Sequence, residues 1–248
     1  MVYRMNLTPM LEEYGKDLRL SPSGILKMLE NAGTRHSAAV GDSLGECLAR
    51  GEAWFLTDWY VEIYTRIPMG LEVRVETFCR KSERTAALLR EFRMRDEEGN
   101  LIALASSKWV KVSVEDQRIL RVDDEVLEQY DALAFSVFGE LPPPPRHGVL
   151  PSLYECEIPL RRVDFDMYSH VHNLQYLEYA FEAIPREVYE AHAMRAFHIT
   201  YVKAITEGQH VVAKCAETKD GYAVFIEADG VLAATVDLWV PHAKKQDE

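Results

Sequence analysis

The order of apolar and polar residues along the chain predicts two helices, one in each half. The first is predicted over residues 25–33, where Ser21 suits the N-cap, Pro22 suits the first turn and Gly33 interrupts or ends the pattern. The second is predicted over 174–182, where apolar side chains cover much of the helix surface. A helix that is apolar nearly all round is usually buried, so we expect this one inside a domain.

Strand-like segments follow each helix in the same order. After the first helix they are 59–64, 67–70 and 71–78, and after the second they are 197–202, 205–208 and 210–215. Each half then has a hairpin pattern: 89–95 and 101–110 flank a turn at 96–100, and 222–227 and 231–240 flank a turn at 228–230. One helix followed by antiparallel strands in each half predicts an α+β fold built from a duplicated unit.

A linker separates the two halves. Residues 142–145 are four consecutive prolines, which cannot join a helix or a central strand and form a stiff, extended connector. We therefore expect an N-terminal domain over 1–140, a proline-rich linker over 141–150 and a C-terminal domain over 151–248.

Composition narrows the class of protein. The 248 residues are 48% hydrophobic, which is enough material for two globular cores. The net charge of -12 argues against a nucleic-acid binder, and it means that an acidic partner must dock on a local basic patch. No apolar run reaches the roughly 20 residues of a membrane-spanning helix, and the first residues resemble no signal or transit peptide. The four cysteines are far apart, which favours reduced thiols in a cytoplasm: Cys47, Cys79, Cys156 and Cys215.

The segment 162–173 carries the clearest chemistry. It brings two carboxylates, two imidazoles and an amide to the entrance of the second helix: Asp164, Asp166, His170, His172 and Asn173. Free N–H groups at a helix start can polarise a carbonyl and stabilise an oxyanion, and a nearby carboxylate can take a proton from water. These parts are sufficient to hydrolyse a thioester without a covalent nucleophile.

This segment is similar to the Asp-x-Asp-x-x-x-His-Val-x-Asn signature of hot-dog thioesterases. The whole chain, from about Tyr3 to Trp239, resembles the acyl-acyl-carrier-protein thioesterase family, also through 54–57, 64–68 and 105–110. The resemblance implies two tandem hot-dog domains, each an antiparallel sheet wrapped around a long buried helix, with the C-terminal domain catalytic. It further implies hydrolysis of acyl-carrier-protein thioesters to free fatty acid, which ends chain elongation, with no cofactor.

The resemblance also suggests roles for individual residues. Asp166 matches the catalytic-site aspartate, as general base or water-orienting group, and His170 matches the catalytic-site histidine. Asn173 matches the asparagine that opens the helix and would bind substrate. Tyr168 stands where the family has asparagine, and its hydroxyl is a candidate donor. The glutamate-cysteine pair of plant members falls near 204–205, where this chain has alanine and isoleucine.

The first half offers an internal comparison. Residues 17–21 occupy the equivalent place, and we expect Ser21 to stand where His170 stands in the second half. The first domain then lacks the histidine, and the resemblance gives it a structural and acyl-chain-binding role.

Other interpretations remain open for the same residues. His170 is alternatively a structural histidine that caps the helix. Asp164 is expected to be structural, in an exposed ion pair with Arg161 or Arg162. The histidines two residues apart fit no zinc pattern, so we expect no metal. On the helix, Glu178 is alternatively a second carboxylate or a solvated edge residue, and Glu182 has the same two interpretations.

Three functions therefore compete: hydrolysis of acyl-carrier-protein thioesters, hydrolysis of acyl-coenzyme A, and acyl binding without catalysis. The densest positive region is 80–84 with Arg90, Arg93 and Arg95, which is either a solvated strand face or a landing site for the acidic carrier protein. A tandem pair already provides the two-domain unit that single hot-dog proteins form by dimerising, so a monomer fits. The resemblance to the family also fits a homodimer.

Overall fold

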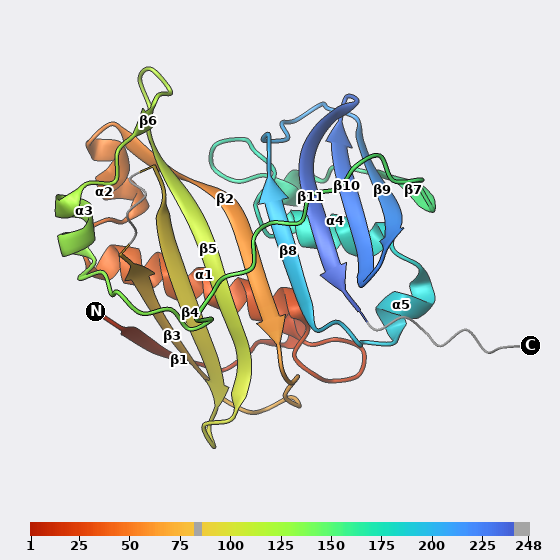
Figure 1. Ribbon diagram of the computed structural model, residues 1–248, viewed down its shortest axis with the longest axis horizontal. Coiled ribbons are helices and arrows are strands. Elements are labelled where there is room, and N and C mark those ends of the chain that lie inside the picture. Colours follow the sequence, from red (N-terminus) through yellow and green to blue (C-terminus); the bar gives the residue numbers. More distant parts are fainter. Residues whose placement is uncertain (82–85, 241–248) are drawn as a thin grey trace, which may run out of the picture. The chain divides into compact units, whose positions relative to one another are not determined.

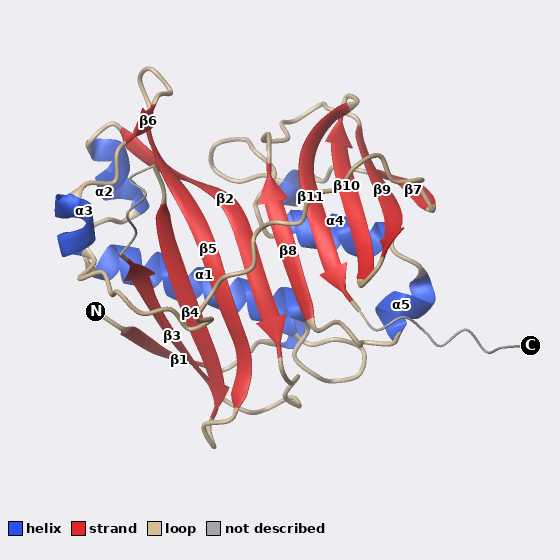
Figure 2. Cartoon of the chain, viewed as in Figure 1, coloured by secondary structure: helices blue, strands red, loops and turns tan. Residues whose placement is uncertain are grey.

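The computed structural model describes residues 1–81 and 86–240. It separates into two compact units, Met1–Pro142 and Pro143–Glu248, with the boundary inside the run of four prolines. In each unit, one antiparallel sheet packs against a helix that lies on one of its faces (Figure 2). This is the α+β arrangement that the sequence predicts.

The N-terminal unit has five principal strands in the order β1-β3-β4-β5-β2, and β6 pairs with β5. The strands are β1 (Tyr3–Leu7), β2 (Glu52–Ile63), β3 (Val73–Arg80), β4 (Leu88–Asp96), β5 (Leu101–Ser113) and β6 (Ile119–Leu120). The helices are the 3-10 turn η1 (Leu11–Glu13), α1 (Pro22–Ala39), α2 (Leu44–Ala49) and α3 (Asp124–Gln129). Figure 1 shows α1 lying against one face of this sheet.

Helix α1 begins as predicted but ends later. The Ser21 hydroxyl accepts a 2.9 Å hydrogen bond from the Gly24 N–H, and Pro22 occupies the first turn. Of the two alternatives for Gly33, that it interrupts or that it ends the helical pattern, the second is wrong, because α1 continues to Ala39. A Cβ at Gly33 would lie 3.3 Å from Cδ of Arg90 and 3.5 Å from the Phe92 ring. The glycine therefore lets the sheet approach the helix closely.

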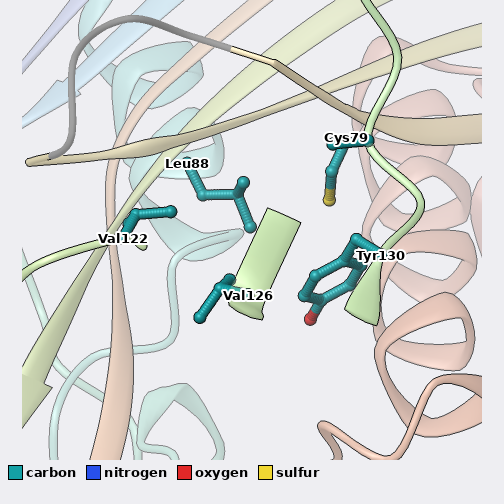
Figure 3. Packing of buried hydrophobic residues seen from close by; sticks show 6 residues of the cluster. Cys79, Leu88, Val122, Val126 and Tyr130 are labelled. Carbon is teal, nitrogen blue, oxygen red and sulfur yellow. The ribbon is translucent and has the colours of Figure 1, made fainter. Parts of the chain in front are cut away.

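Helix α3 covers one end of the N-terminal sheet. Its Val126 and the following Tyr130 pack onto strand residues Cys79 and Leu88, as Figure 3 shows. All four side chains are at least 94% buried, so this cluster extends the core beyond α1. The pattern of the sequence did not predict α3 or this cluster.

The C-terminal unit repeats the design with strand order β8-β11-β10-β9-β7. Its strands are β7 (Tyr154–Ile158), β8 (Ala196–Tyr201), β9 (Val211–Thr218), β10 (Gly221–Ala228) and β11 (Val231–Trp239). Its helices are the 3-10 turn η2 (Arg162–Asp164), α4 (Gln175–Ala183) and α5 (Arg186–Glu190). Helix α4 is the predicted buried helix, shifted by one residue.

The two predicted hairpins are confirmed as β4–β5 and β10–β11. Segments 67–70 and 205–208 are not strands, and each contributes only one bridge residue, Pro68 and Thr206. The edge strands β1 and β7 were not predicted, because a short edge strand needs no long apolar alternation. Among the described residues, no helix combines the length and apolarity needed to cross a bilayer.

Candidate active site

A tight turn in the C-terminal unit brings Asp166 and His170 together. Phe165 and Val171 pair as an isolated antiparallel bridge. Between them, the Asp166 N–H donates to the His170 carbonyl at 2.8 Å, and Ser169 adopts a left-handed conformation with φ of 59°. The chain therefore reverses over five residues, and the predicted catalytic pair lies at the base of this reversal.

The Asp166 side chain is fixed by the turn that it begins. Its Oδ1 accepts hydrogen bonds from the main-chain N–H of Tyr168 at 2.8 Å and of His170 at 3.1 Å. Both bonds end on the same oxygen, which leaves Oδ2 as the oxygen to receive a proton. Asp166 as a whole is half-buried.

His170 is also half-buried, and its main chain bridges to Thr206. Its ring centroid lies 6.5 Å from that of Tyr168. The alternative that His170 caps the helix is wrong, because the ring that bonds the helix start is that of His172. Its Nδ1 accepts the Leu174 N–H at 3.3 Å, just before α4 begins.

Asn173 and Tyr168 lie at the ends of this segment. Asn173 is half-buried, and its main-chain oxygen accepts a 2.9 Å hydrogen bond from the Tyr201 hydroxyl. Tyr168 is 39% exposed at the tip of the turn. The main chain of the turn thus brings Asp166 and His170 together at its base, and the ring of Tyr168 lies near that of His170.

Asp164 is structural, as predicted, but it is not part of an exposed pair. It is fully buried, and its carboxylate accepts bonds from Arg161 Nη2 at 2.8 Å and from the Tyr179 hydroxyl at 2.9 Å. Burial alone would raise the pKa of Asp164, but the hydrogen bonds from Arg161 and Tyr179 and the charge of Arg161 outweigh it and hold the pKa below its usual value. The carboxylate therefore anchors the start of the turn in its ionised form.

Tyr176 is a site residue that the pattern of the sequence concealed. Its hydroxyl accepts a 3.3 Å hydrogen bond from the Ile205 N–H, and the Ile205 carbonyl accepts from the Val171 N–H at 2.8 Å. Burial and, to a smaller extent, the charge of Asp166 raise the pKa of Tyr176 to about 12, against the lowering effect of the hydrogen bond from Ile205. In the sequence Tyr176 reads only as one more apolar residue of a buried helix, although a buried tyrosine needs a partner for its hydroxyl.

The N-terminal unit contains the same turn with different side chains. The Gly15 N–H donates to the Arg19 carbonyl at 2.8 Å, and Leu18 has φ of 59°. These bonds align Gly15 with Asp166 and Arg19 with His170. The Ser21 N–H donates to the Glu13 carbonyl as the His172 N–H donates to the Asp164 carbonyl, which aligns Ser21 with His172. The prediction that Ser21 stands at the position of His170 is therefore wrong. The conclusion drawn from it holds, because Gly15 and Arg19 stand where the C-terminal turn has Asp166 and His170.

A guanidinium closes the N-terminal turn. Arg66 Nη1 and Nη2 lie 2.6 and 3.0 Å from the two carboxylate oxygens of Asp17, and Arg66 Nε donates to the Leu20 carbonyl at 2.8 Å. The residue in the place of Arg66 in the C-terminal unit is Ala204, which precedes Ile205 as Arg66 precedes Ile67. The C-terminal turn therefore lacks the guanidinium that closes the N-terminal one.

The glutamates of α4 lie elsewhere. Glu178 and Glu182 line a hollow of about 570 Å³ with Arg161, Tyr179 and residues of β7, and Asp166 and His170 are not part of its wall. Within 1–81 and 86–240, no group of three His, Cys, Asp or Glu side chains is arranged to hold a metal ion. Of Asp166, Glu178 and Glu182, only Asp166 therefore lies at the turn.

Family models match both units of the chain. The model of the acyl-ACP thioesterase N-terminal domain matches residues 1–130, and that of the C-terminal domain matches 152–233. Among known proteins, oleoyl-acyl carrier protein thioesterase 2 of Arabidopsis thaliana is 30% identical over 165 residues, which are 60% of this chain and 43% of that protein. Thioesterase 1 of the same plant is 26% identical, over 76% of this chain and 56% of its own length. The chain thus spans about half the length of these relatives.

Two solved structures share the fold along almost the whole chain. The 12:0-ACP thioesterase from Umbellularia californica has a TM-score of 0.84 at 20% identity, covering 97% of each chain. An acyl-ACP thioesterase from Bacteroides thetaiotaomicron has a TM-score of 0.85 at 17% identity, covering 97% of this chain and 98% of the other. The predicted pair of tandem hot-dog domains is confirmed.

Proposed function

This chain belongs to the acyl-acyl-carrier-protein thioesterase family, and we propose that it hydrolyses acyl-carrier-protein thioesters. The products are a free fatty acid and the carrier protein with its free thiol, so the reaction ends chain elongation in fatty-acid synthesis. The observation that carries the proposal is the Asp166 carboxylate, held through Oδ1 by the main-chain N–H groups of Tyr168 and His170. The chemistry needs no cofactor.

In this mechanism Asp166 activates water. Its Oδ2 accepts a proton as the water oxygen attacks the thioester carbonyl carbon. The resulting oxyanion is stabilised by the positive end of α4 and by His170, and Asn173 orients the acyl group. The carbon–sulfur bond then breaks, and the leaving thiolate takes up the proton. Tyr168 is the candidate hydroxyl donor at the rim of the turn.

The two units divide the work in this proposal. The C-terminal domain, 151–248, is catalytic, and the N-terminal domain, 1–140, binds the acyl chain and has a structural role. The closed turn of the N-terminal unit supports this division, since Arg66 and Asp17 are ion-paired there. The four cysteines are free thiols, which supports the cytoplasmic location that we propose.

A second candidate function is acyl binding by the same fold without thioester hydrolysis. Tyr168 in place of asparagine, and alanine and isoleucine at 204–205, favour a protein that binds acyl chains without cleaving them. Release of free acid separates the candidates when it is measured with acyl-carrier-protein and acyl-coenzyme A as substrates for the wild type, Asp166→Asn and His170→Ala. Hydrolysis of the carrier-protein substrate that both variants lose is the expected result.

Other results point elsewhere. If the wild type cleaves only acyl-coenzyme A, the carrier in the natural substrate is coenzyme A and not the carrier protein. If it cleaves neither substrate at any chain length, the protein is not a thioester hydrolase. Full activity in both variants moves the site away from the 166–170 turn.

A further inference from the structure

The outer face of the N-terminal sheet, opposite α1, has a covered part and an open part. The segment after α3 crosses it, as Figure 1 shows. Its contacts with the sheet are Leu133 with Arg80, Phe135 with Phe78 (4.6 Å between ring centroids) and Ser136 Oγ with Glu91 (2.9 Å). These contacts cover the end of the face where β3 finishes and β4 begins. The opposite end of these two strands, where β3 begins and β4 ends, lies outside these contacts and is the open part of the face.

The open part carries four arginines from three adjacent strands. We name Arg4 of β1, Arg74 of β3, and Arg93 and Arg95 of β4 the basic face. The strand register places Glu76 opposite both Arg4 and Arg93. Its carboxylate lies 2.9 Å from Arg4 Nε and 3.4 Å from Arg93 Nη1. One carboxylate is thus shared between two of the four guanidinium groups.

The other two arginines face each other. Arg74 lies directly opposite Arg95 in the antiparallel pair β3–β4. Within the described part of the chain neither forms an ion pair, and Arg95 Nη1 instead donates to the Gly99 carbonyl at 2.6 Å. Like charges directly opposite each other in a sheet are destabilising. In a chain with 40 acidic and 28 basic residues, an unneutralised arginine pair at this place needs a physical reason.

The structure also reduces the basic region that the sequence outlines. Arg90 points to the other side of the sheet, where it is buried and bonds His36 Nδ1 at 2.7 Å. Arg80 is neutralised by Glu91 at 3.3 Å. Residues 82–84 lie outside the described residues. Lys81, which follows β3, is exposed and forms no ion pair with another described residue. On strands β3 and β4 themselves, the unneutralised positive charge lies on Arg74 and Arg95.

We propose that the basic face is the docking surface for the acidic acyl carrier protein, an inference that rests on the proposed function. The net charge of -12 repels an acidic partner at long range, so productive encounters require a local region of opposite sign. Carboxylates of the carrier protein neutralise Arg74 and Arg95, which offsets their mutual repulsion in the free protein. Arg93 extends the surface along β4, and Arg4 extends it onto the neighbouring strand β1.

The double variant Arg74→Glu/Arg95→Glu tests this proposal with two substrates. One is the acyl carrier protein loaded with a fatty-acyl chain, and the other is the same acyl chain on pantetheine, which has the same thioester without the protein. We expect KM for the carrier-protein substrate to rise about tenfold or more with kcat nearly unchanged. Both constants for acyl-pantetheine stay at wild-type values. The salt dependence of KM for the carrier-protein substrate becomes weaker in the variant.

The matched control is Arg118→Glu/Arg121→Glu, which makes the same charge change at two exposed arginines of the same unit. It leaves KM for both substrates within about twofold of wild type. An equal rise of KM in the control, or an equal loss with acyl-pantetheine, overturns the docking surface. Unchanged KM in the test variant, with loss of binding to anionic phospholipid vesicles, overturns it in favour of a membrane surface. A wild type that hydrolyses neither substrate refutes the proposed function instead.

Discussion

The main-chain N–H of His170 donates a 3.1 Å hydrogen bond to the carboxylate of Asp166, so the two residues proposed for catalysis also hold each other's backbone in place. Substitutions at Asp166 therefore have a chemical and a structural effect. Asparagine keeps the acceptor oxygen and removes the base, whereas alanine removes both.

We expect Asp166→Asn to lower kcat by roughly 100-fold or more while the thermal midpoint stays near that of the wild type. Asp166→Ala should lose activity to the same extent and also about 1–2 kcal/mol of unfolding free energy, because two main-chain donors lose their acceptor. Steady-state kinetics and chemical denaturation measure the two effects. Equal stabilities of the two variants would contradict the structural role of Oδ1.

Tyr176 and Tyr179 provide a matched pair on one helix. Tyr176→Phe removes the acceptor of the Ile205 N–H beside Asp166, whereas Tyr179→Phe removes a donor to Asp164. We expect Tyr176→Phe to lower kcat about tenfold. Tyr179→Phe should cost about 1 kcal/mol of stability with nearly normal kcat per folded molecule. Activity assays with thermal denaturation check both, and the opposite assignment of the two effects would rule out a place for Tyr176 in the site.

The buried Asp164 predicts a specific acid response. Its folded-state pKa is lowered, so its contribution to stability is present above the unfolded pKa of about 3.9 and disappears as pH falls through the folded pKa. Asp164→Asn should therefore be less stable than wild type at neutral pH by about 1–3 kcal/mol. The difference should shrink below about pH 4. Denaturation curves between pH 2 and 7 measure it, and a constant difference across this range would contradict the prediction.

The closed turn of the N-terminal unit predicts loss of stability without loss of chemistry. Arg66→Ala removes the ion pair with Asp17 and leaves the Leu20 carbonyl without its guanidinium donor. We expect a loss of about 1–3 kcal/mol, with kcat per folded molecule unchanged. Asp17→Asn, which keeps Arg66 in place, should lose less. A large fall in kcat at full stability would show that this turn takes part in the reaction.

Much of the fold was predictable because its signals are local. Alternation in the paired strands and the Asp/Gly turns predicted both long hairpins, and a nearly all-apolar segment predicted α4. The role of Gly33 was missed because it depends on the sheet: a Cβ there would make a tight 3.3 Å contact with Cδ of Arg90. The edge strands are short, and α3 is stabilised by contacts with Cys79 and Leu88 that no local pattern reveals.

The candidate site residues that lie in one short segment could be predicted from the sequence. Those that the fold brings together from distant segments could not. Asp166 and His170 are four residues apart, so the motif indicates both. Tyr176 enters through a hydrogen bond to Ile205, 29 residues away. The match of Ser21 with His170 failed because it was made by counting toward the helix, whereas the main-chain bonds of the two turns align it with His172.

In these two turns the main-chain conformation is the same, whereas the side chains differ. The same carbonyl and N–H groups close both, and Leu18 and Ser169 both have φ of 59°. Since main-chain bonds maintain the shape, the same turn forms with Gly15 and Arg19 at the positions of Asp166 and His170. After a gene duplication, such a turn lets one copy lose its reaction and acquire a new task while the other continues to provide the original one.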